Sequence, residues 1–150
     1  MNRMKNKRIL LGASFVGVVC LVASAIASQQ VPEQKTMDSK VYATHKKKLV
    51  TFTHKKHSGD YKIPCADCHH VYKDGKNVWE EGAVVQKCGE CHSEAKAPKG
   101  KDAPKLSKAE KIEKYHYSAI HENCVGCHKA EKKKGKKAPT ACKDCHPKKE

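Results

Sequence analysis

The chain has 150 residues, with 31 Lys and Arg against 16 Asp and Glu, and a formal charge of +15. This length fits a single domain, but aromatic residues make up only 5% of it, and large apolar side chains are scarce after residue 27. Such a chain cannot offset its conformational entropy with a side-chain core, so it is either disordered or built around something other than side chains.

Residues 1–27 have the pattern of a secretory signal peptide. Residues 1–8 carry four positive charges, residues 9–27 are apolar or small, and Ala25-Ile26-Ala27 forms a small-residue cleavage site. We expect cleavage after Ala27 and export to the periplasm, with loss of Cys20. The apolar run is also long enough to span a bilayer, so an uncleaved anchor is the alternative. Cleavage leaves 27 basic against 16 acidic residues, a net charge of +11.

The next segments are predicted in chain order. Residues 28–44 are polar and are expected to be a flexible lead-in to a domain at residues 45–150, with His45 as a surface residue. Alternation in "LVTFT", residues 49–53, predicts a short strand that ends near His54 and His57. The turn "DGKN", residues 74–77, predicts a small hairpin, and Trp79 is expected to cover an edge of the group that replaces the side-chain core or to be partly buried.

A lysine-rich loop and a helix are predicted in the second half. Residues 96–106 are rich in Pro, Gly and Lys and are expected to form a loop. Ser107 and Glu110 then form a capping box, and apolar residues recur on one helical face at Ile112, Tyr115, Ala119 and Ile120.

Four copies of C-x-x-C-H carry the chemistry. This is the attachment signature of c-type haem, in which two thiols bind the vinyl groups of one porphyrin and the following imidazole reaches the iron. We therefore expect four covalently bound haem c groups, whose rings supply the missing core. The residues are Cys65, Cys68 and His69; Cys88, Cys91 and His92; Cys124, Cys127 and His128; and Cys142, Cys145 and His146.

Three other uses of paired cysteines are less consistent with this pattern. C-x-x-C pairs also bind zinc, act as redox dithiols, or form disulfides in exported proteins. None of these uses needs a histidine after the second cysteine. Only 10 of 150 residues are His, so four such histidines would not follow by chance. The composition therefore favours haem.

Six further histidines are available for the second axial position of each iron. Met37 is the only methionine after residue 27, so methionine ligation of four irons is excluded. An iron with two histidine ligands has no vacancy for a substrate, which favours electron transfer over catalysis. His70 directly follows His69 and diverges from it, so it can reach a neighbouring haem. The six histidines are His45, His54, His57, His70, His116 and His121.

Two histidines compete for the fourth iron. His121 lies three residues before Cys124, at the end of the predicted helix, and is the preferred ligand. His116 lies five residues earlier and therefore on a different helical face, one turn from Ile112 and Ile120, where it is expected to pack. His116 stays open as the alternative.

The order Phe52-x-His54-x-x-His57, then C-x-x-C-H-H, then two late motifs resembles the tetrahaem (class III) cytochrome c3 family over residues 49–147. The resemblance implies a small, mainly irregular and α-helical domain with few helices and a short N-terminal β-hairpin, wrapped around four haems. It also implies that the residue matching His54 is the sixth ligand of haem 1, the one matching His57 serves haem 3, and the one matching His70 serves haem 2. A histidine shortly before the third motif serves haem 4, and Phe52 lies between haems 1 and 3.

The family resemblance implies a monomeric, low-potential periplasmic electron carrier and not an enzyme. Its electrons pass between hydrogenase or other redox enzymes and membrane-associated acceptors. The alternatives are a multihaem reductase of metal ions or oxyanions, and a subunit of a membrane redox complex anchored by an uncleaved signal. Nucleic acid is not an expected partner, because no aromatic-interleaved basic motif is present.

The expected partner has an acidic docking surface that meets a lysine-rich edge of haem 4, through electrostatic steering. The lysines of that edge are Lys129, Lys132, Lys133, Lys134, Lys136, Lys137, Lys143, Lys148 and Lys149.

Overall fold

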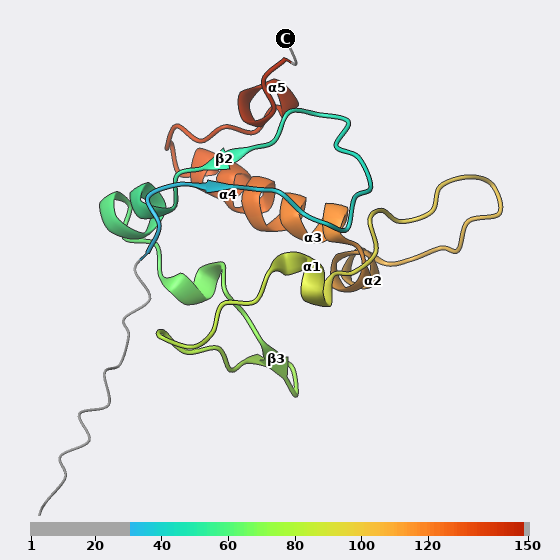
Figure 1. Ribbon diagram of the computed structural model, residues 1–150, viewed down its shortest axis with the longest axis horizontal. Coiled ribbons are helices and arrows are strands. Elements are labelled where there is room, and N and C mark those ends of the chain that lie inside the picture. The colour runs from blue at the N-terminus through green and yellow to red at the C-terminus, as the bar shows by residue number, and fades with distance from the viewer. Residues whose placement is uncertain (1–30, 149–150) are drawn as a thin grey trace, which may run out of the picture.

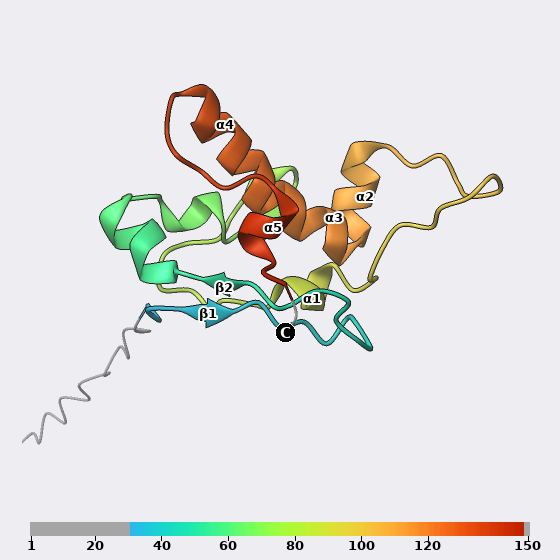
Figure 2. The same ribbon diagram turned by 90° about the horizontal axis from the view of Figure 1, so that it is seen from above.

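The computed structural model describes residues 31–148 (Figure 1). The expectations for the signal peptide, the Ala27 cleavage site and Lys149 lie outside these residues. Within them, two small antiparallel sheets and several short helices surround one long helical stretch, and the loop before α2 projects from the body in both views (Figures 1 and 2).

The first sheet joins β1 (Lys35–Thr36) to β2 (Thr51–Phe52), with Lys35 opposite Phe52. This confirms the short N-terminal hairpin and the strand in "LVTFT". The segment expected to be a flexible lead-in is more structured than its composition suggested. Its Met37 N–H donates to the Val50 carbonyl at 2.8 Å, a contact that local composition cannot reveal. In Figure 2 the two strands run along one side of the domain.

The second sheet joins β3 (Tyr72–Lys73) to β4 (Lys76–Asn77). Asp74 and Gly75 connect them with φ angles of 50° and 74°. Two successive positive φ values define a type I′ turn, which Asp-Gly favours because its twist matches that of the paired strands. The predicted hairpin is confirmed, although Lys76 and Asn77 already belong to its second strand.

The capping box begins α2 (Lys108–Lys114). The Glu110 N–H donates to the Ser107 hydroxyl at 3.2 Å, and the Ser107 N–H donates to the Glu110 carboxylate at 2.7 Å. The helix was expected to continue through Ile120, but Tyr115 is extended, with φ −107° and ψ 119°. It forms a bridge with Glu94, whose carbonyl accepts the His116 N–H at 2.7 Å, and this pairing interrupts the helix.

A long helical stretch follows, made of α3 (His116–His121), the π-helical η3 (Glu122–Gly126) and α4 (Cys127–Lys133). The junction residues Glu122 and Cys127 keep right-handed helical angles, so the three segments form one continuous rod (Figure 1). The remaining helical turns are short. They are η1 (Lys56–Asp60), η2 (Cys65–Asp67), α1 (Cys88–Cys91) and α5 (Cys142–Cys145).

The described residues form almost no side-chain core. Only Tyr115, His116 and Ala119 are buried among residues 31–148, and none of these residues has a side chain less than 2% exposed. This agrees with the composition, which gives the polypeptide too little apolar surface to fold on its own. Within the same residues, no helix is long and apolar enough to cross a membrane.

Candidate haem-binding site

Each C-x-x-C-H motif adopts a helical turn. The first motif begins with η2, which Cys68 directly follows, and the second cysteine pair lies on α1. The third pair lies on η3 and α4, with His128 inside α4, and the fourth lies on α5. In three motifs the histidine N–H donates to the carbonyl of the first cysteine at 2.9 Å, as His69 does to Cys65. A helical turn places side chains three apart on one face, so both thiols of a motif face the same side.

The four motifs gather in one region of the molecule. Burial, and to a smaller extent the neighbouring thiols of Cys68, Cys145 and Cys88, raise the pKa of the Cys124 thiol to about 11. Each of those three cysteines belongs to a different motif. Burial also raises the pKa of Cys68, which keeps that thiol protonated, unlike the low-pKa thiolate of a redox dithiol.

Among the described residues, the cysteines and histidines form neither a disulfide nor a cluster of three metal ligands. All eight described cysteines are free thiols. Among residues 31–148, no three His, Cys, Asp or Glu side chains converge as a metal-binding group. The histidines are arranged in pairs instead.

Four pairs of histidine rings lie at nearly the same centroid separation, with interplanar angles from 23° to 85°, and we call them the facing pairs. Each pair joins a motif histidine to one of the further histidines. Their centroid distances are 6.0 Å for His54 and His69, 6.0 Å for His70 and His92, 6.2 Å for His57 and His128, and 6.3 Å for His121 and His146.

This separation fits two imidazoles on opposite sides of one metal ion. Metal–imidazole bonds are about 2.0–2.1 Å long. A nitrogen lies about 1.1 Å from the centre of a five-membered ring whose bonds are about 1.33 Å. Two rings bound to one metal from opposite sides therefore have centroids about 6.3 Å apart. All four pairs lie within a few tenths of an ångström of that value, so the residues present fit a haem iron between each pair.

Two local features distribute the histidines among different pairs. His69 and His70 are adjacent, yet His69 faces His54 and His70 faces His92. His54 and His57 also belong to different pairs. His57 lies in the π-helical turn η1 and is paired with His128, whereas His54 precedes that turn. Burial and the neighbouring His54 lower the pKa of His69, which favours the neutral imidazole that a metal requires.

Phe52 lies close to both His54 and His57. Its ring centroid is 5.6 Å from that of His54 and 4.5 Å from that of His57. The Phe52 ring therefore packs beside one histidine of each of two pairs.

Hydrogen bonds at Nδ1 orient five of the eight paired rings. The Nδ1 of each lies 2.7–2.9 Å from a backbone carbonyl, so Nδ1 carries the proton and Nε2 keeps its lone pair for a metal. The five are His57, His92, His121, His128 and His146.

The two remaining histidines have different surroundings. His116 is 4% exposed, and its Nδ1 lies 3.1 Å from the Tyr42 hydroxyl, within a packed contact between α3 and the lead-in segment. The Nε2 of His45 lies 2.9 Å from the Asp38 carboxylate. Neither ring takes part in the four facing pairs, whereas His121 does. The assignment of His121 as the ligand stays a prediction, and the geometry supports it.

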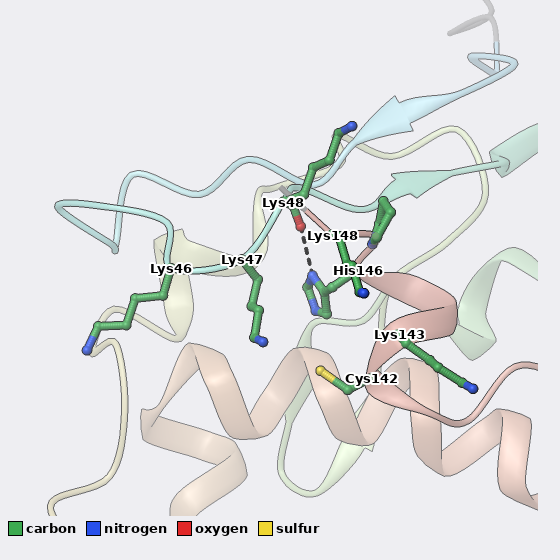
Figure 3. A pocket seen from close by; sticks show the side chains of 8 residues that line it. Lys46, Lys47, Lys48, Cys142, Lys143, His146 and Lys148 are labelled. Carbon is green, nitrogen blue, oxygen red and sulfur yellow. Dashed lines mark hydrogen bonds between the residues drawn. The ribbon is translucent and has the colours of Figure 1, made fainter. Parts of the chain in front are cut away.

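The surroundings of the fourth motif contain two lysines that the sequence analysis named, Lys143 and Lys148, and three that it missed, Lys46, Lys47 and Lys48. A cavity of about 600 Å³ is lined by His121, His146 and both motif cysteines. A second hollow of about 480 Å³ lies beside the same motif, and five lysines line it (Figure 3). We call them the motif-4 lysines: Lys46, Lys47, Lys48, Lys143 and Lys148.

A long-range hydrogen bond explains why the lysines at residues 46–48 lie beside the fourth motif. The Lys48 carbonyl accepts a hydrogen bond from His146 Nδ1 at 2.9 Å, across 98 residues of sequence (Figure 3). The run "KKK" at residues 46–48 is visible in the sequence, but only this long-range contact links it to the motif.

Comparison with known proteins agrees with this geometry. The model of the class III cytochrome C family matches residues 27–146. A cytochrome c3 from Maridesulfovibrio salexigens is 36% identical over 124 residues, which cover 79% of this chain and 96% of that protein. A cytochrome c3 from Desulfovibrio desulfuricans is 33% identical over 101 residues, which cover 66% of this chain and 78% of that protein. The chain belongs to the class III cytochrome c family and is a multihaem electron carrier that binds haem c covalently.

Proposed function

We propose that this protein is a periplasmic, low-potential electron carrier with four c-type haems, each bound by two histidines. The observation that carries the proposal is the set of four facing histidine pairs, at separations of 6.0–6.3 Å. Each pair contains one motif histidine, so each covalent attachment site has its own second ligand. The eight motif cysteines would hold the four porphyrins.

The ligand set explains why the function is transfer and not catalysis. A haem iron stores and releases one electron, and two histidine ligands leave it no position for a substrate. Histidine in place of methionine lowers the reduction potential. The Nδ1 hydrogen bonds lower it further, because they make the histidines more basic ligands.

Charge supports a partner with an acidic surface, such as a hydrogenase or a membrane redox complex. The motif-4 lysines line a hollow beside Cys142 and His146, and a second group of lysines begins at the last residue of α4 and continues into the loop after it. We call this second group the loop lysines: Lys133, Lys134, Lys136 and Lys137. Together they would steer an acidic partner toward the fourth haem, which raises the rate of encounter more than the final affinity.

One carboxylate opposes part of this charge. Glu131 lies 2.7 Å from the ammonium of Lys134 and 2.5 Å from that of Lys136. Hydrogen bonds from Lys134 and Lys136 lower the pKa of Glu131 to about 2, so it is ionised under all ordinary conditions. Replacing it by Gln therefore adds one positive charge without changing a lysine.

Intact mass and a pyridine haemochrome assay of the exported holoprotein test the proposal. We expect the mass of residues 28–150 plus four haems, and low-spin spectra without carbon monoxide binding in the native state. A smaller haem count, bound zinc, or a high-spin iron that binds carbon monoxide would contradict it, and the last result would favour the reductase. A retained N-terminus of 27 residues would favour the anchored subunit.

A further inference from the structure

A single asparagine fastens the β3–β4 hairpin to the first haem motif. The Asn77 side-chain amide donates to the carbonyls of Ala66 at 3.3 Å and His69 at 3.1 Å. Its oxygen accepts the N–H groups of Val71 at 3.0 Å and Trp79 at 3.1 Å. The amide thus uses both of its donors and both lone pairs of its oxygen. It fixes the strand end that carries Trp79 against the turn that carries His69.

The result of this attachment is a tryptophan beside a predicted iron ligand. The Trp79 ring centroid lies 5.1 Å from that of His69, with an angle of 34° between the ring planes. The rest of the hairpin is open to solvent, with Tyr72 at 68% and Val78 at 49% exposure. Packing of the hairpin therefore does not account for the position of the indole.

The indole N–H of Trp79 is buried and has no hydrogen-bond acceptor among residues 31–148. A buried donor without a partner is rare in a native protein and calls for an acceptor beyond the described residues. A haem attached at Cys65 and Cys68 would lie next to His69, and its two propionate carboxylates are its strong hydrogen-bond acceptors. A bond to an ionised acceptor is shorter and stronger than one between neutral groups.

We propose that Trp79 donates its indole N–H to a propionate of the haem held by Cys65, Cys68 and His69, and that Asn77 is the positioning residue for this contact. The inference rests on the proposed attachment of haem at the first motif. It adds a binding contact for the carboxylate side chain of that haem, separate from the thioether and iron bonds.

Nuclear magnetic resonance of the fully reduced holoprotein tests the contact without any substitution. The chain contains one tryptophan, so its indole ¹⁵N–¹H resonance needs no assignment among others. We expect nuclear Overhauser effects from this proton to the propionate methylene protons of the first haem, and slow exchange with deuterium oxide. Exchange as fast as that of a free indole, or effects to a different haem or to protein protons alone, would overturn the proposal.

Two variants separate the donor from the packing of the ring. Trp79→Phe keeps an aromatic ring against His69 and removes the N–H, so the midpoint potential of the first haem should shift while the other three stay in place. Asn77→Ala keeps the indole but releases the hairpin, so the indole proton should lose its effects to the propionate and exchange faster. An unchanged first potential in Trp79→Phe, or an unchanged indole signal in Asn77→Ala, would count against the proposal.

A matched control and the haem count distinguish this inference from the proposed function. Tyr72 lies 5.4 Å from the ring of His70, another predicted ligand, and is largely exposed. Tyr72→Phe removes a polar hydrogen beside a ligand and should leave all four potentials unchanged. Loss of haem from the first motif in the wild type would refute the proposed function. A full haem load with an indole that does not contact the propionate would refute only the role of Trp79.

Discussion

The identity of the second ligand of the fourth iron gives the sharpest prediction, because two alanine variants should differ in effect. One should lose an iron ligand, and the other should lose stability. His121→Ala removes the ring that faces His146 at 6.3 Å, while the hydrogen bond from His146 to Lys48 remains. One iron should then become five-coordinate and bind one carbon monoxide per chain. The other three irons should stay low-spin, because their facing pairs share no histidine with this one.

His116→Ala should instead affect stability. The substitution removes a ring that is 4% exposed and leaves the Tyr42 hydroxyl without its partner at 3.1 Å. Loss of a hydrogen bond in this part-buried contact costs about 0.5–1.5 kcal/mol, and loss of the packed ring adds to that cost. The holoprotein should therefore unfold at a lower temperature or denaturant concentration, while all irons remain six-coordinate and do not bind carbon monoxide.

Carbon monoxide titration, followed by electron paramagnetic resonance of the oxidised protein, measures the ligand change in both variants. Thermal denaturation followed by circular dichroism measures the stability change. A high-spin iron in His116→Ala together with a fully low-spin His121→Ala would reverse the ligand assignment and refute the argument from ring separation.

Three further predictions concern charge, packing and potential. Replacing the loop lysines by Glu should slow reduction of this protein by an acidic partner steeply at low salt and leave the four reduction potentials nearly unchanged. Glu131→Gln should increase the same rate. Stopped-flow rates that do not depend on ionic strength would contradict the steering role. A Cβ at Gly89 would lie 2.7 Å from Val41 Cγ2, so Gly89→Ala should cost about 1–3 kcal/mol in denaturation experiments. Gly126→Ala meets only the mobile end of Glu122 and is the matched control; equal losses would refute the clash. His70→Met should raise mainly the potential of the second haem in a redox titration, and a uniform shift of all four would oppose the assignment.

Local patterns in the sequence predicted the parts of this structure that depend on neighbouring residues. The capping box at Ser107, the Asp74-Gly75 turn and the strand at Phe52 all depend on residues within a few positions of one another. Motif spacing likewise depends on neighbouring residues, and it predicts which residues would hold a porphyrin. The ligand pairing came from the family resemblance, and the facing rings support it.

Contacts between distant segments could not be predicted in this way. The break at Tyr115 depends on its bridge to Glu94, and the structure of the lead-in depends on pairing with residues near Val50. The role of Asn77 is equally hidden, because its acceptors lie 8 and 11 residues away in another turn. No periodicity or composition in the sequence marks such contacts.

The hydrogen bond between Lys48 and His146 has a consequence for how the protein matures. Its two residues are 98 positions apart, so a chain that emerges from a membrane pore N-terminus first exposes Lys48 long before its partner. His57 likewise emerges well before its partner His128, because the first two haem motifs lie between them in the sequence. In each of the four pairs the second ligand precedes the motif histidine in the chain, except that His70 directly follows the first motif and precedes its partner His92, so it has already emerged when the motif that it serves appears. Under the proposed ligation, a haem attached at any of the four motifs would therefore have its second histidine available at once, and a partly exported chain would not have to hold an iron with an open position.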